Sequence, residues 1–132
     1  MENYHVNLNP KIKDWEVPDL RESVGWERRD SDYPLLFEKC TFWVGVHEKG
    51  KLIAFGYIAG TGLEHGYLED IMVHPGYQRK GIGSALVKIL LEEAKRIGIK
   101  IVTVTFKASH SNFYSRCGFM PSSAGLWRNE VN

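Results

Sequence analysis

The strongest pattern of apolar and polar positions lies between Gly83 and Gly98. Apolar residues recur there at the three- and four-residue spacing of one helix face, and charged residues occupy the other positions. Gly98 follows the last apolar position, where a helix commonly ends. The pattern predicts an amphipathic helix whose buried face carries Leu86, Ile89, Leu90, Ala94 and Ile97.

Runs of β-branched and aromatic residues predict strands on both sides of this helix. We expect strands over residues 4–9, 41–47, 52–59, 65–74, 100–106 and 126–131, with a hairpin turn at 48–51. Shorter helices are expected over 14–24, 33–39 and 109–116, the last with Ser109 as its N-cap.

The order of these elements predicts a fold class. The strand, helix and strand across residues 66–106 predict two parallel neighbours joined by a right-handed crossover, whereas the preceding strands form antiparallel hairpins. We therefore expect residues 1–132 to form one α/β (α+β) domain, with a mixed central sheet flanked by helices on both faces.

The composition limits the kinds of partner that the protein is expected to bind. The 132 residues suffice for one hydrophobic core, and 43% hydrophobic with 25% charged residues is typical of a globular protein. A formal net charge of +1 offers no electrostatic footprint for nucleic acid or an acidic membrane. There is no apolar run long enough to span a bilayer and no signal-peptide pattern, so we expect no membrane partner and a cytoplasmic location.

Cysteine and histidine positions predict no metal centre. Cys40 and Cys117 are too few for a disulfide framework or a ligand set, and their apolar neighbours favour burial. The five histidines show no ligand spacing.

The loop before the amphipathic helix is typical of anion binding. Amides at a helix start have no intrahelical partner and lie at the positive end of the helix dipole. Gly81 and Gly83 allow a phosphate to approach them closely, and Arg79 and Lys80 add positive charge. The alternative is a simple turn, because a glycine pair before a helix is common.

Two segments resemble a known family. The sequence Gln78-Arg79-Lys80-Gly81-Ile82-Gly83, preceded by Val73-His74-Pro75, is similar to the Q/R-x-x-G-x-G/A pyrophosphate signature of the GNAT superfamily of acyl-CoA N-acyltransferases. Residues 113–119 resemble that family's F/L-Y-x-x-x-G-F segment. The resemblance covers most of the chain and is weakest over the first third. It implies a GNAT-like fold with a β-bulge and splayed parallel strands, here 66–74 and 100–106, at the CoA site.

The resemblance also implies acetyl-CoA as the acyl donor. Backbone groups of Ile71, Met72 and Val73 would pair with pantetheine, and the amide near Met72 would polarise the acetyl carbonyl. Lys107 stands where the family often has asparagine, so we consider Asn112 for the contact with the CoA arm. The residues implied for the pyrophosphate are Gln78, Arg79, Lys80, Gly81, Ile82, Gly83 and Ser84.

Three side chains are candidates for proton transfer. Tyr114 matches the family tyrosine at the CoA sulfur and is our general acid; the alternative is a core aromatic. Strict strand alternation places Glu69 on one face with Tyr67, Ile71 and Val73, and Asp70 on the other with Leu68 and Met72. Glu69 is our candidate base and acceptor contact, with Asp70 second; the alternative for either is a structural hydrogen bond or an arginine ion pair.

Trp26, in the loop 25–32, falls where the family lines its acceptor pocket; the alternative is packing at the edge of the core. We expect an acetyl-CoA-dependent N-acetyltransferase that acetylates a primary amine of a small molecule or peptide by direct transfer in a ternary complex. The rivals are a non-catalytic acyl-CoA-binding or regulatory module and a scaffold domain that binds no CoA. Edge strands such as 41–47 or 126–131 could pair in a homodimer.

Overall fold

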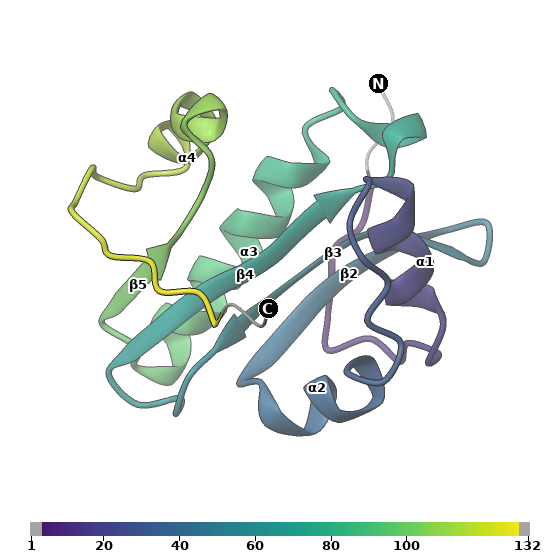
Figure 1. The fold of residues 1–132 in the computed structure, drawn as a ribbon, viewed down its shortest axis with the longest axis horizontal. Helices are drawn as coiled ribbons and strands as arrows, with labels where there is room; N and C mark the ends of the chain where they lie inside the picture. Colours follow the sequence, from purple (N-terminus) through teal and green to yellow (C-terminus); the bar gives the residue numbers. More distant parts are fainter. Residues whose placement is uncertain (1–3, 130–132) are drawn as a thin grey trace.

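A mixed five-stranded sheet organises the chain, with its strands side by side in sequence order (Figure 1). The computed structural model describes residues 4–129. Antiparallel pairing joins the first four strands, and β4 and β5 are parallel. The strands are β1 (Asn7–Leu8), β2 (Phe42–Glu48), β3 (Lys51–Ala59), β4 (His65–Val73) and β5 (Ile101–Val104).

Helices cover both faces of this sheet. Helix α3 (Ile82–Ile97) connects β4 to β5 and buries most of its apolar stripe against one face; it contributes Leu86, Val87 and Leu90 to a core with β2 and β3. The predicted burial of Ile97 is wrong, because this last residue of the helix is exposed. Helices α1 (Glu16–Ser23) and α2 (Tyr33–Lys39) form a second core on the other face. Two short 3₁₀ helices, η1 (Pro75–Tyr77) and η2 (Ala108–His110), precede α3 and α4 (Ser111–Arg116).

The predicted fold class is confirmed, with differences at the ends of the chain. The first strand shortens to two residues, and residues 126–129 form no strand; the rest of that predicted strand lies outside the described residues. Ser109 lies within η2, and α4 has His110 at its N-cap position, so the predicted serine cap is wrong. The strand predicted at 41–47 is not an edge, because β2 pairs with both β1 and β3.

A β-bulge in β4 changes which side chains share a face. Phe55 lies opposite Met72 and Tyr57 opposite Glu69, so three steps along β4 match two along β3. The extra residue is accommodated at Asp70, whose φ of +53° is rare for a residue with a side chain.

The strict alternation predicted for β4 is therefore wrong. Leu68 packs into the core beneath α3, while Met72 belongs to the core beneath α1 and α2. Asp70 and Glu69 both face the α1 and α2 side, because Asp70 bonds Tyr33 there and Glu69 lies opposite Tyr57. Ile71 and Val73 instead pack on the α3 side.

The two parallel strands separate beyond the bulge. Pairing between β4 and β5 runs only from His65 with Ile101 to Leu68 with Val104. Figure 1 shows β4 continuing beside β3 while the chain after β5 turns away toward α4. The second half of β4 therefore has one edge without a neighbouring strand. Among the described residues, the helices are all too short or too polar to cross a membrane.

Candidate active site

A cavity opens where β4 and β5 separate. It has a volume of about 580 Å³ and lies between the end of β4, the start of α3 and helix α4. Its lining comprises Ile71, Met72, Val73, Tyr77, Gln78, Arg79, Gly81, Ile82, Gly83, Ser84, His110, Phe113, Tyr114 and Arg116. The cavity thus joins the two sequence motifs, although they lie some thirty residues apart.

The loop before α3 presents backbone amides to this cavity. Gly81 is the N-cap of α3 with φ +81°, and Arg79 also has a positive φ of +63°. The amides of Ile82, Gly83 and Ser84 begin the helix, where no preceding carbonyl is available to them. The Gln78 side chain donates from Nε2 to the Val73 carbonyl at 2.9 Å, which ties the loop to the end of β4.

Close packing explains the glycine at position 83. A Cβ added there would lie 3.3 Å from the Phe113 ring, tighter than an ordinary contact. Any larger side chain would displace Phe113 or enter the cavity. The absent side chain leaves the helix start open to an anion.

Most predicted cofactor residues line the cavity, but Lys80 and Asn112 do not. Both side chains are exposed. Sequence reasoning missed Tyr77, His110, Phe113 and Arg116 as lining residues. Phe113 and Arg116 lie inside the second motif. Their closeness to Tyr114 in the sequence could have identified them as lining residues.

Tyr114 projects into the cavity from α4. Its side chain is buried and stacks on Phe106, with ring centroids 4.8 Å apart. No described residue hydrogen-bonds its hydroxyl, and the oxygen is not fully buried, so it remains accessible to water or a ligand in the cavity. Burial raises the pKa of this hydroxyl above its usual value, with a contribution from Cys117. The group therefore stays protonated at neutral pH and can donate a proton or hydrogen bond.

Glu69 lies on β4 just before the bulge. Its side chain is exposed and faces the α1 and α2 side, opposite Tyr57. Desolvation by the adjacent sheet raises the pKa of its carboxyl, and the negative charge of Asp70 adds to that rise. A carboxylate with a raised pKa is a better proton acceptor than an ordinary glutamate.

Asp70 is engaged in an ion pair. Its Oδ2 accepts a hydrogen bond from Arg21 Nη1 at 2.9 Å and a short one from the Tyr33 hydroxyl. Burial raises the pKa of Tyr33 above its ordinary value, with Asp70 adding to it, so the hydroxyl remains the donor. The arginine ion pair considered from the sequence is the arrangement that Asp70 adopts.

Trp26 lies beside the same arginine. The Arg21 guanidinium lies 5.3 Å from the centre of the indole ring, within the range of a cation–π contact. The side chain is 39% exposed, so one part of the ring remains available to solvent.

Cys117 lies beside Tyr114 but is not placed as a nucleophile. Burial raises the pKa of the Cys117 thiol, which makes it a poor nucleophile at neutral pH. Within residues 4–129 there is no cluster of three or more His, Cys, Asp or Glu side chains placed to hold a metal ion.

Comparison with known proteins places this geometry in a family. The model of the Acetyltransferase (GNAT) family matches residues 9–119. The [ribosomal protein bS18]-alanine N-acetyltransferase of Escherichia coli K12 is 33% identical over 120 residues, covering 82% of this chain and 79% of that protein.

Two further similarities cover a sugar-phosphate enzyme and a solved structure. The glucosamine 6-phosphate N-acetyltransferase of Schizosaccharomyces pombe is 34% identical over 70 residues, covering 53% of this chain and 60% of that protein. The GNAT family protein SP0256 of Streptococcus pneumoniae has the same fold, with a TM-score of 0.80, 23% identity and coverage of 98% and 100% of the two chains.

Proposed function

Because the chain belongs to the GNAT family of acetyltransferases, we propose that its cavity binds acetyl-CoA and that it acetylates a primary amine by direct transfer. The observation that carries this proposal is the cavity between the separated strands, which joins free helix-start amides to the unpaired Tyr114 hydroxyl. The residues fit the donor: the amides of 82–84 suit a pyrophosphate, and the unpaired edge of β4 near Met72 suits the amides of a pantetheine arm.

The chain's own groups then have defined roles. The amine nitrogen attacks the thioester carbonyl, a C–N bond forms and the C–S bond breaks. Glu69 accepts the proton that the amine loses, directly or through water, and the Tyr114 hydroxyl donates one to the departing sulfur. The amide near Met72 stabilises the negative charge on the carbonyl oxygen.

The charges around the acceptor side favour an amine without phosphate, such as a peptide α-amine. A phosphate needs free cations, but Arg21 is paired with Asp70 and Arg29 with Asp32 at 2.7 Å. Arg28 bonds three carboxylates, those of Asp19, Glu22 and Asp30. These three arginines are thus already neutralised, as is Asp70. Glu69 forms no ion pair among the described residues, so its carboxylate attracts a protonated amine before that amine is deprotonated.

Calorimetric titration followed by an acceptor assay tests the proposal. We expect saturable binding of acetyl-CoA and much weaker binding of acetyl-pantetheine, which lacks the pyrophosphate. Acetylation should then be measured with a peptide that begins with alanine and with glucosamine 6-phosphate, and the peptide should be preferred. Absence of acetyl-CoA binding would contradict the whole proposal, and preference for the sugar phosphate would contradict only the acceptor class.

The rival function is a non-catalytic acyl-CoA-binding module. It would give the same titration but no acetylated amine from a broad panel of peptides and small amines. The Tyr114 hydroxyl favours catalysis over this rival, because it lines the cavity, is accessible there and has no hydrogen-bond role in the described part of the fold.

A further inference from the structure

One buried arginine connects the acceptor side of the molecule to the catalytic strand. Arg21 is 7% exposed, the sole buried charged side chain within residues 4–129. It lies in the last turn of α1. A buried charge is costly unless its hydrogen bonds are satisfied, so the partners of this guanidinium show what it holds together.

The first partner is the β4 bulge. Arg21 Nη1 donates to Asp70 Oδ2 at 2.9 Å and to the Tyr33 hydroxyl at 3.2 Å, and Tyr33 in turn donates to Asp70. Asp70 has the positive φ that accommodates the extra residue of the bulge. The three side chains therefore hold the carboxylate of a strained position, directly after Glu69.

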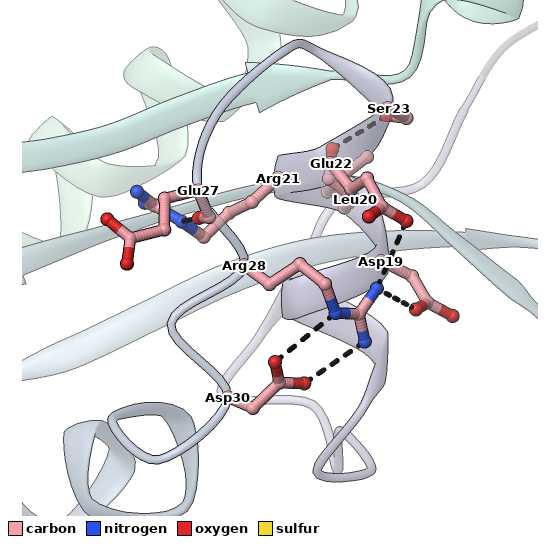
Figure 2. A network of polar contacts seen from close by, with 8 residues as sticks. All are labelled: Asp19, Leu20, Arg21, Glu22, Ser23, Glu27, Arg28 and Asp30. Carbon is pink, nitrogen blue, oxygen red and sulfur yellow. Dashed lines mark hydrogen bonds and ion pairs between the residues drawn. The ribbon is translucent and has the colours of Figure 1, made fainter.

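The second partner is the loop after α1. Arg21 Nε donates to the carbonyl oxygen of Glu27, as Figure 2 shows, and the guanidinium packs against the Trp26 ring. The Trp26 amide also donates to the Arg21 carbonyl at 2.9 Å. Residues 26 and 27 are thus fixed to the same side chain that holds the bulge.

We propose that Arg21 is a positioning residue for the acceptor site, which holds the loop 24–32 and the β4 bulge in one geometry. The inference rests on the proposed acetyl transfer. Its consequence is that Trp26 and Glu69 are held in a constant relation, although Trp26 follows α1 and Glu69 lies more than forty residues later. Arg21 itself contacts no reacting atom.

A lysine at position 21 cannot make the same set of contacts. The guanidinium uses Nε toward Glu27 and Nη1 toward Asp70 and Tyr33, in directions fixed by its plane. A lysine ammonium keeps the charge but is a single point of donation and cannot reach both sides. Arg21→Lys therefore preserves neutrality with Asp70 and removes the link between loop and bulge.

A second arginine provides a matched control. Arg28 of the same loop bonds Asp19 and Glu22 of α1 and Asp30 of the loop, as Figure 2 shows, and forms no hydrogen bond or ion pair with β4. Arg28→Lys is the same substitution in the same segment, without the link to the bulge.

The first test needs no acceptor. Amide hydrogen exchange should be measured on the full chain, with acetyl-CoA affinity determined in parallel. For Arg21→Lys we expect faster exchange both in the loop 24–32 and in β4 around residue 70, with acetyl-CoA affinity within about twofold of the parent. Arg28→Lys should affect the loop and its contact with α1 but leave β4 unchanged. Unchanged exchange in β4 for Arg21→Lys would overturn the proposal, whether or not the protein acetylates any amine.

The second test separates positioning from general loss of structure. With the alanine peptide as acceptor, Arg21→Lys should raise the peptide KM by ~10-fold and change kcat by less than about threefold. Partial unfolding would instead lower kcat and leave KM unchanged, and that result would contradict the proposal. If Arg21→Lys does not fold, Tyr33→Phe removes one hydroxyl from the same cluster and should shift KM in the same direction; an unshifted KM there would count equally against it.

A double substitution tests whether Arg21 affects the peptide KM through the loop that carries Trp26. If Arg21 acts through the loop, adding Trp26→Ala to Arg21→Lys should raise KM by less than the product of the two separate effects. Fully multiplicative effects would mean that Arg21 and Trp26 act independently, which the proposal excludes.

Discussion

At the scale of single residues, Tyr114 and Glu69 are complementary in proton chemistry. Both have raised pKa values, chiefly because of desolvation, but the consequences differ. A raised tyrosine pKa keeps the proton on the hydroxyl, which suits an acid. A raised glutamate pKa makes the carboxylate a stronger base. Desolvation thus suits Tyr114 to the role of acid and Glu69 to the role of base.

Removal of the Tyr114 hydroxyl should impair catalysis selectively. We expect Tyr114→Phe to lower kcat by ~10²-fold or more, because the departing CoA thiolate then has no proton donor. Acetyl-CoA affinity should stay nearly constant, since the ring still stacks on Phe106. Steady-state kinetics and calorimetry on the same preparation measure both. An unchanged kcat would make Tyr114 a core aromatic only.

The pH dependence of kcat/KM should report on Glu69. Its base form is lost as pH falls through its pKa, so activity should decline on the acidic side with an apparent pKa above the 4.5 of an unperturbed glutamate. A peptide α-amine, which titrates at about 8, adds a second decline of its own.

Glu69→Gln separates these two contributions. The variant should lose the lower limb and keep the limb that belongs to the amine, and the exposed Glu64→Gln should keep both. A profile unchanged by Glu69→Gln would show that another group, or water alone, accepts the proton.

At the scale of elements, the start of α3 is the proposed anion site. The helix presents its first amides beside glycines 81 and 83, and Phe113 of α4 packs against position 83. Helix α4 therefore supports the loop as well as carrying Tyr114, the proposed general acid. The binding of the donor and the placement of Tyr114 depend on the same contact between two short segments.

A bulky acidic residue at position 83 should abolish donor binding. In Gly83→Glu the new Cβ would lie against the Phe113 ring, and the carboxylate would repel the pyrophosphate. We expect at least ~100-fold weaker acetyl-CoA binding by calorimetry, with a folded protein by circular dichroism. Gly125→Glu is the matched control, because a Cβ at that glycine meets no atom within 4 Å. Retained affinity in Gly83→Glu would contradict the loop assignment.

At the scale of the whole molecule, strand β4 separates two sides of the sheet that are covered by different helices. The donor cavity is formed with α3 and α4, whereas Glu69, Asp70 and Trp26 lie on the side of α1 and α2. The separation of β4 from β5 is the opening between them. Donor and acceptor can therefore approach from opposite sides of the sheet and meet at the bulge, as direct transfer requires.

Donor binding should stabilise the entire fold. A ligand that binds only the folded state at about 100 times its Kd adds ~2.7 kcal/mol to the free energy of unfolding. For a domain of this size the increase raises Tm by on the order of 10 °C. Thermal unfolding with acetyl-CoA measures it, and acetyl-pantetheine at the same concentration should give a much smaller shift. Equal shifts would show that the pyrophosphate contributes nothing to binding.

The sequence alone determined the features that depend on local spacing. The amphipathic stripe of α3, the hairpin between β2 and β3, and the glycine loop at 78–83 all arise from residues close along the chain. Helix periodicity and turn chemistry act over a few residues, so one sequence suffices to predict them. The motif around Tyr114 also identified the candidate acid before its surroundings were known.

Only the tertiary structure decided which side chains meet. Strict alternation put Glu69 and Asp70 on opposite faces, but the bulge opposite Gly56 puts both on one face. The partner that occupies Asp70 comes from α1, 49 positions earlier in the chain. A bulge results from the fit between two strands, and a buried ion pair from the packing of distant elements. Neither leaves a periodic signal in the sequence, because the interactions that stabilise them exist only once the chain has folded.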